Sequence, residues 1–140
     1  MSRTIRLDLP VPAEDLYGYL TDPRRRPEWQ ASLRRVDDLR GTGGVGSSWV
    51  DVTAVGARPA MRVSVAEPNR LWIEQGSWRG LAAELRLELL AYALRRTRLT
   101  ATFSITGVGL YALPAAVLER LAAPAIRADL AYGAERATLA

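Results

Sequence analysis

The sequence contains no cysteine, no histidine and no lysine, and all 19 basic residues are arginine. Without cysteine the chain forms neither a disulfide framework nor a thiolate nucleophile. Without histidine it lacks the most frequent general base, and a transition-metal site would need carboxylates alone. Without lysine, Schiff-base chemistry is excluded. We therefore expect no metal site and no cofactor.

Long apolar runs are also missing, and charges of both signs are mixed along the chain. No uninterrupted apolar run approaches the roughly 18 residues typical of a membrane span, and the first residues alternate charged with apolar side chains, unlike a signal peptide. The net charge is +4, but the arginines lie in small clusters among acidic residues, which is typical of a solvated surface. The sequence thus predicts a single cytoplasmic domain over residues 1–140, without a membrane span or a nucleic-acid partner.

Apolar and polar residues alternate through most of the chain, with the period of a half-buried β-strand. The pattern predicts strands at 4–9, 33–40, 47–55, 60–67, 70–77, 82–92 and 97–108. Because the links between the last six are short, successive strands should form antiparallel hairpins. Gly41, Gly43 and Gly46 have the spacing of a dinucleotide-binding motif, but β-forming residues follow them where that motif needs a helix. We interpret this segment as a strand connection.

Helical patterns occur after the first strand and at the end of the chain. Pro12 opens a short helix, and a second short helix is expected around 27–29. The segment 111–138, rich in alanine, leucine, glutamate and arginine, predicts one long helix. Pro124 lacks an N–H and clashes with the carbonyl four residues earlier, so a kink is expected near Leu121. A curved sheet that closes on one long helix encloses a pocket, so the pattern indicates an α+β fold with a pocket.

Several short motifs occur in the order found in a known family. They are Pro-Ala-Glu-Asp-Leu-Tyr at 12–17, Asp-Pro at 22–23 with Pro-Glu-Trp at 27–29, Gly-Val-Gly-Ser at 44–47, Glu-Pro-Asn-Arg-Leu at 67–71 and Thr-Arg-Leu-Thr at 97–100. Over nearly its whole length, the chain resembles the START-like (SRPBCC) superfamily, in its bacterial polyketide cyclase/dehydrase-like branch.

The resemblance implies a helix-grip fold. In this fold a seven-stranded curved antiparallel sheet surrounds the long C-terminal helix, two short helices follow the first strand, and a cavity lies between sheet and helix. Members bind sterols, lipids, hormones or aromatic polyketides, and some catalyse cyclisation or dehydration. No single catalytic motif defines the branch, so the resemblance carries over no catalytic residue.

Strand parity predicts which side chains face the pocket. If Val55 pairs with Ala60, residues 50, 52 and 54 share the inner face, and Trp49 and Asp51 fall on the outer one. Pairing 67 with 70 and 77 with 82 then extends the inner face over further residues: Met61, Val63, Val65, Trp72, Glu74, Gly76, Ala83, Leu85, Leu87 and Leu89. Glu74 would lie among apolar side chains, where a carboxyl favours its protonated form and can act as an acid or base. One β-bulge would instead turn it to solvent or pair it with an arginine.

Other candidates lie at the cavity mouth and on the last helix. Trp29 packs the second short helix or contacts ligand, Trp78 sits at a hairpin tip, and the Tyr132 phenol either hydrogen-bonds a ligand oxygen or fills the core. The candidate catalytic residues are Glu74 and Tyr132. The candidate ligand-binding residues are Trp29, Val63, Trp72, Trp78, Leu85, Leu87, Asp129 and Tyr132.

Three functions are compatible with this architecture. The first is binding of a small, largely apolar polyketide- or lipid-like ligand in an enclosed cavity. The second is a polyketide cyclase, aromatase or dehydratase that acts by substrate orientation and acid–base catalysis. The third is a regulatory or protein-interaction module, in which the protein's own side chains fill the cavity. The apolar last helix allows a homodimer, and its charged residues allow a monomer.

Overall fold

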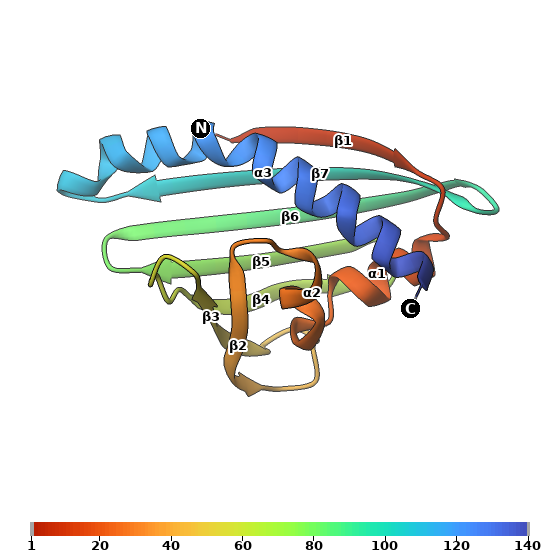
Figure 1. Ribbon diagram of the computed structural model, residues 1–140, viewed down its shortest axis with the longest axis horizontal. Helices are drawn as coiled ribbons and strands as arrows, with labels where there is room; N and C mark the ends of the chain where they lie inside the picture. Colours follow the sequence, from red (N-terminus) through yellow and green to blue (C-terminus); the bar gives the residue numbers. More distant parts are fainter. Residues whose placement is uncertain (1, 140) are drawn as a thin grey trace.

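The computed structural model describes residues 2–139, and its elements follow the order expected from the sequence (Figure 1). The strands are β1 (Arg3–Leu9), β2 (Leu33–Arg40), β3 (Ser48–Thr53), β4 (Ala60–Glu67), β5 (Leu71–Trp78), β6 (Leu81–Ala93) and β7 (Arg96–Gly107). The helices are α1 (Ala13–Leu20), η1 (Pro23–Arg25), α2 (Arg26–Trp29), η2 (Gly109–Tyr111) and α3 (Ala112–Leu139).

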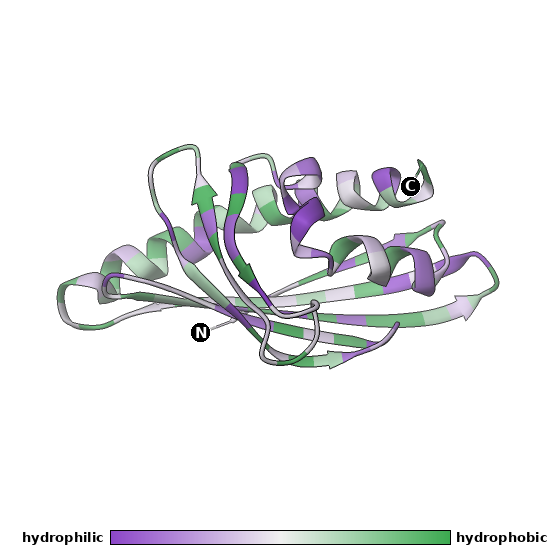
Figure 2. Cartoon of the chain, turned by 90° about the horizontal axis from the view of Figure 1, so that it is seen from below, coloured by the Kyte–Doolittle hydropathy of each residue, from purple (hydrophilic) through white to green (hydrophobic). Residues whose placement is uncertain are grey.

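The strands form one seven-stranded antiparallel sheet in the order β1-β7-β6-β5-β4-β3-β2. The sheet curves, and α3 runs across its concave face, while α1 and α2 lie on that same side near the end of α3 (Figure 2). This is the helix-grip α+β fold, so the expected fold class is confirmed. The glycines at 41, 43 and 46 lie in the connection between β2 and β3 with positive φ values, as a strand link requires.

The predicted register is correct between β5 and β6 and wrong for β3. It is also wrong by one residue at the β4–β5 turn, where Glu67 pairs with Leu71 and not with residue 70. Ser77 pairs with Ala82 as expected, and Val63 lies opposite Glu74. In β3, however, it is Val50 that pairs with Ala60. The β3–β4 link is longer than assumed, since it contains its own turn in which Thr53 N–H donates to the Ala57 carbonyl. The shift reverses the parity of β3 and turns Trp49 and Asp51 inward.

A β-bulge interrupts the β4–β5 pairing between Val63 and Val65. Beyond it Val65 pairs with Ile73, whereas the inner-face prediction grouped Val65 with Val63. The bulge adds one residue to β4. The pairing near the turn, with Glu67 opposite Leu71, is therefore shifted by one residue from the pairing in the middle of the hairpin, where Val63 lies opposite Glu74. Glu74 stays on the inner face.

Helix α3 packs on the core through the C-terminal half of its length. Leu130, Gly133, Ala134 and Ala137 are buried there. A Cβ on Gly133 would lie 2.8 Å from a Leu20 methyl, so glycine at this position lets the helix approach α1 closely. Pro124 lies inside the helix, which changes direction about half-way along in Figure 1.

Apart from the buried Ala115 and Glu119, the N-terminal half of α3 is apolar and exposed. Leu113 and Leu121 are 75% and 66% exposed, and Leu110 in η2 is 95% exposed. By length and composition alone, Gly109–Leu139 could cross a membrane, although no uninterrupted apolar run predicts it. The charged residues Glu119 and Arg120 lie in this segment, and the Glu119 carboxylate accepts a hydrogen bond from the backbone of β7.

Glu119 attaches the exposed half of α3 to the sheet. Within residues 2–139, β1 begins at Arg3, opposite Phe103. The Ile105 N–H donates to Glu119 Oε2 at 2.9 Å, and Arg3 Nε lies 3.8 Å from Oε1. The carboxylate thus supplies the acceptor that this partly buried backbone N–H needs.

Glu119→Ala is expected to lower the free energy of unfolding by about 1–3 kcal/mol, because it leaves the Ile105 N–H unpaired. Urea unfolding followed by far-UV circular dichroism measures the change. Glu135→Ala, at an exposed position of the same helix, is the control and should change stability by no more than about 0.5 kcal/mol. Equal effects of the two substitutions would contradict the role of Glu119.

Candidate functional site

A buried guanidinium lies at the centre of the space between the sheet and the helices. Arg26 is 3% exposed and donates four hydrogen bonds to two buried carboxylates. Its Nε and Nη2 donate to Asp51 at 3.3 and 3.0 Å, and its Nη1 and Nη2 donate to Glu74 at 2.8 and 3.0 Å. Both contacts are bidentate, the geometry that gives an arginine–carboxylate pair its strength and direction.

Two tryptophans complete this group. Trp49 Nε1 donates to Asp51 Oδ1 at 2.8 Å, and Trp72 Nε1 donates to Glu74 Oε1 at 2.8 Å. The guanidinium of Arg26 also lies 5.0 Å from the ring centroid of Trp49, within cation–π range. We call Arg26, Asp51, Glu74, Trp49 and Trp72 the arginine cluster. It joins α2 to β3 and β5.

Local sequence explains how the cluster is built. Asp22 accepts the Arg24 N–H at 3.1 Å and caps the 3-10 turn, from which α2 begins at Arg26. On β3 and β5, each tryptophan stands two residues before the carboxylate that it contacts. Residues two apart share a strand face, so each strand brings an indole N–H beside a carboxylate.

The cluster carries an excess of negative charge. Burial by itself lowers the pKa of Arg26, but the charges of Glu74 and Asp51 outweigh burial and raise this pKa above its ordinary value. Arg26 therefore stays protonated, and one positive group faces two carboxylates.

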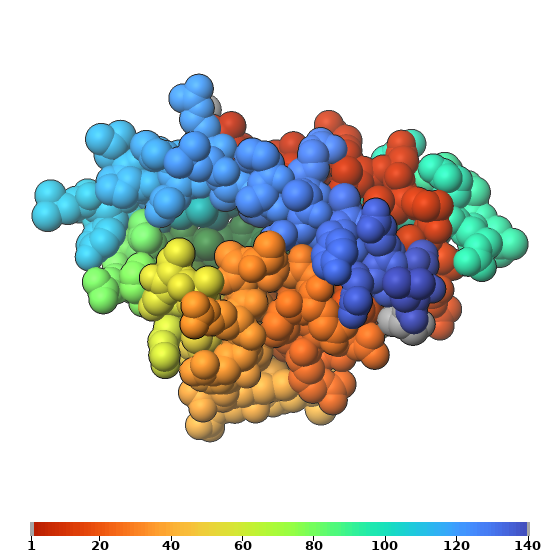
Figure 3. Space-filling model, viewed as in Figure 1, coloured from red at the N-terminus to blue at the C-terminus, as the bar shows by residue number. Residues whose placement is uncertain are grey.

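An apolar cavity of about 190 Å³ lies beside the arginine cluster, between the sheet and α3. Its lining comes from α2, from β4 to β7 and from α3: Arg26, Trp29, Gln30, Met61, Glu74, Ala83, Glu84, Leu85, Phe103, Ser104, Ile105, Ile126, Asp129 and Leu130. Figure 3 shows a recess between α3 and the segment that contains α2 and β2, with the sheet as its floor.

Asp129, on α3, lines the same cavity as Arg26 and Glu74. The Ala31 N–H donates to its Oδ1 at 3.3 Å, which ties the α2–β2 connection to α3. Burial raises the pKa of Asp129, and the hydrogen bond from Ala31 opposes this rise in part. An outer recess of about 280 Å³ shares Trp29, Gln30 and Asp129 with the cavity, so these residues separate the two spaces.

Four of the predicted site residues line the cavity: Trp29, Glu74, Leu85 and Asp129. Three others, Val63, Trp72 and Leu87, are buried in the core without lining it. Trp78 stacks under Arg79 at the β5–β6 turn, 4.6 Å from ring centroid to guanidinium carbon, away from the cavity.

Tyr132 lies in the outer recess and not in the cavity. It is 48% exposed and lines the recess with residues of the α2–β2 segment. It stands two positions after the buried Leu130, and helical residues two apart point in different directions. The structure thus places this phenol outside the cavity, and a contact between Tyr132 and a ligand stays a prediction.

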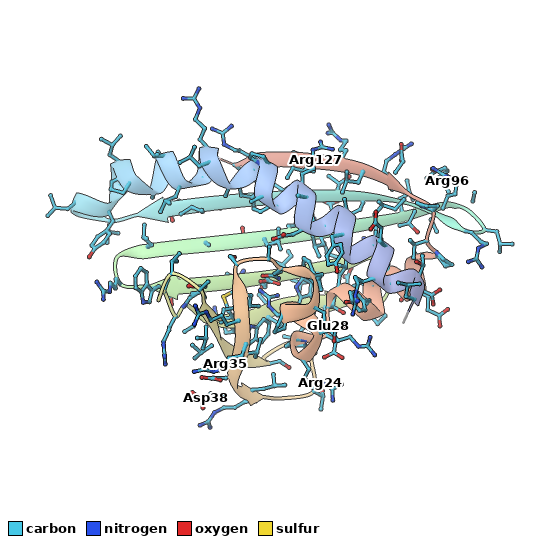
Figure 4. All side chains as sticks on the ribbon, in the orientation of Figure 1. Arg24, Glu28, Arg35, Asp38, Arg96 and Arg127 are labelled. Carbon is cyan, nitrogen blue, oxygen red and sulfur yellow. The ribbon has the colours of Figure 1, made fainter. Side chains whose placement is uncertain are left out.

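Sequence reasoning missed Arg26 and Asp51. Asp51 was placed outside because the assumed β3–β4 link reversed the strand, and Arg26 belongs to one of the small arginine clusters that were interpreted as solvated surface. A signal was present: the pattern Trp-x-acid occurs on two strands, at 49–51 and 72–74. Two such pairs call for a shared cation once both face inward. Figure 4 shows the labelled charged side chains, such as Arg24, Arg35 and Arg96, around the outside of the fold.

Comparison with known proteins identifies the fold. No family model matches the sequence, and no curated protein matches it. Solved structures do match: a START superfamily protein from Mycobacterium smegmatis has a TM-score of 0.80 at 14% identity, with 99% of this chain and 97% of that one covered. The ZhuI aromatase/cyclase from Streptomyces sp. R1128 has a TM-score of 0.79 at 15% identity, covering 99% and 93% of the two chains.

The structure of Ara h 8.0201 matches over 100% of both chains, with a TM-score of 0.75 and 13% identity. At these identities the matches establish the fold. The chain has the START-like helix-grip fold, and the resemblance drawn from its motifs is confirmed at that level.

Arg26→Met is expected to destabilise the protein by about 3–5 kcal/mol, because Asp51 and Glu74 stay buried without a counter-charge. The triple variant Arg26→Met/Asp51→Asn/Glu74→Gln should recover part of this loss, since it leaves no buried charge. Urea unfolding measures both, with Arg24→Met as a control: that arginine is exposed and pairs with Asp22, so no measurable change in stability is expected. A stable Arg26→Met protein would contradict the analysis of the cluster.

Asp129→Asn is expected to flatten part of the pH dependence of stability. Because the folded-state pKa of Asp129 is raised, the stability linked to its proton is complete below the unfolded-state pKa. It is lost as pH rises through the folded-state pKa. Between these limits wild type should therefore lose stability relative to Asp129→Asn as pH rises. Unfolding midpoints of the two proteins across acidic pH measure this difference, and parallel curves would contradict it.

Proposed function

We propose that the protein binds a small, largely apolar ligand in the cavity between the sheet and α3. The observation that carries the proposal is the lining of this cavity. Leu85, Phe103, Ile126 and Leu130 supply apolar walls, and few polar side chains interrupt them. Apolar walls with a small number of fixed polar groups are characteristic of small-molecule sites.

The volume limits the size of the ligand. An engineered apolar cavity of about 150 Å³ holds benzene, whereas sites for drug-sized molecules measure about 300–1,000 Å³. A cavity of about 190 Å³ therefore suits one or two fused rings. A longer ligand would have to extend through the recess that is visible in Figure 3.

Two acidic side chains of the cavity lining, Glu74 and Asp129, are already fixed by hydrogen bonds within the protein. Glu74 is fixed by Arg26 and Trp72, so its carboxylate is already bound on one side of the cavity. Asp129 is fixed by the Ala31 N–H on the other side. Side chains that are already ordered lose little entropy when a ligand binds, which favours affinity.

Binding of 2-naphthol, followed by quenching of tryptophan fluorescence, tests the proposal. Saturable 1:1 binding is expected for wild type. Ile126→Trp puts an indole into the cavity and should weaken binding by about tenfold or more, equivalent to about 1.4 kcal/mol. Arg127→Trp is the matched control, because it adds the same ring at the neighbouring exposed position and should leave the affinity unchanged.

Binding that survives Ile126→Trp would place the ligand elsewhere and overturn the proposal. Circular dichroism of both variants shows whether each is folded. A variant Ile126→Phe, with a smaller ring, supplies a second measurement if the tryptophan variant does not fold.

Catalysis is less well supported than binding. The carboxylate of Glu74 is engaged by Arg26 and Trp72, and Tyr132 lies outside the cavity, so neither is placed as a free acid or base. The likeness to an aromatase/cyclase concerns the fold. An interaction module was expected to have a filled interior, and the cavity favours ligand binding over that alternative.

A further inference from the structure

Charge is distributed unevenly around the cavity. Among the charged residues that line it, Arg26 is the one cation and Glu74 and Asp129 are acidic, while the Glu84 carboxylate accepts from Gln75 on the outer face of the sheet. Asp51 adds another carboxylate directly behind Arg26, 3.0 Å from Nη2. The cavity thus has more negative than positive groups, although the protein as a whole carries a net charge of +4.

The positive charge of Arg26 is not available to a ligand anion. Four of its five N–H donors point at Asp51 and Glu74. Two carboxylates at 2.8–3.3 Å outweigh one guanidinium, so an anion in the cavity would meet a net negative group. Burial strengthens this effect, because Arg26, Asp51 and Glu74 are all less than 7% exposed.

Asp129 offers a free acceptor on the opposite side. Its Oδ1 accepts the Ala31 N–H, and no side chain or backbone group among residues 2–139 donates to its Oδ2. A carboxylate accepts through both oxygens, so a hydroxyl or amine of a ligand can donate here. A ligand carboxylate or phosphate has no donor to offer when ionised and would face Asp129 with like charge.

We infer that the cavity selects neutral ring compounds that carry a hydroxyl or amino donor, and that it rejects carboxylates and phosphates of the same size. This inference rests on the proposed function, because it concerns the ligand of the same cavity. It separates aromatic alcohols from aromatic and fatty acids, which apolar walls alone would not distinguish.

The test compares 2-naphthol with 2-naphthoate, two ligands of similar size that differ in charge, by calorimetry at pH 7.5. The naphthol should bind on the order of tenfold tighter or more, because one ligand charge would be placed near uncompensated carboxylates. Equal affinities, or tighter binding of 2-naphthoate, would overturn the inference. If neither compound binds, the proposed function fails and the inference fails with it. If both compounds bind with equal affinity, the proposed function stands and only the inference fails, so the two failures are distinguishable.

Asp129→Asn provides the matched variant. It keeps the size of the side chain and removes one negative charge, so it should improve 2-naphthoate binding and narrow the difference between the two ligands severalfold. Glu135→Gln removes a charge from an exposed position on the same helix and should leave the difference unchanged. If both variants narrow it equally, overall charge and not the cavity sets the preference, and the inference is wrong.

Discussion

The fold depends on one buried cation. Arg26 joins α2 to β3 and β5 through two bidentate ion pairs, and a tryptophan on each strand fixes the carboxylate that it meets. Removing charges from water is costly, and an apolar replacement of the same volume is often as stable. The consequence of the cluster is therefore geometric: it sets the position of the short helices over the sheet and keeps Glu74 at the cavity edge.

Helix α3 completes the cavity with two kinds of contact. Its C-terminal half packs closely, because Gly133 admits Leu20 against the helix backbone. Its N-terminal half is held through Glu119, which accepts the Ile105 N–H of β7. Between these halves lie Pro124 and the lining residue Ile126. A helix tied at both ends and bent between them leaves room above the sheet.

The sequence was sufficient for the order of elements and for the inner faces of β5 and β6. Alternation over 82–92 is long and its turn is short, so the pairing of Ser77 with Ala82 and the inward direction of Leu85 and Leu87 followed directly. The β3–β4 link contains a turn of its own, which the hydrophobic pattern does not reveal. Because the length of this link was misjudged, Asp51, one of the two partners of Arg26, was assigned to the outer face.

We propose that a neutral ring compound binds between Leu85, Ile126 and Leu130. Nuclear Overhauser effects between 2-naphthol and the methyl groups of these three residues test it most directly, with isotope-labelled protein and unlabelled ligand. Contacts to all three methyl-bearing side chains, with none to the exposed Leu113 and Leu121 of the same helix, are the predicted result. Contacts confined to Leu113 and Leu121 would show binding on the exposed half of α3 and would contradict the account.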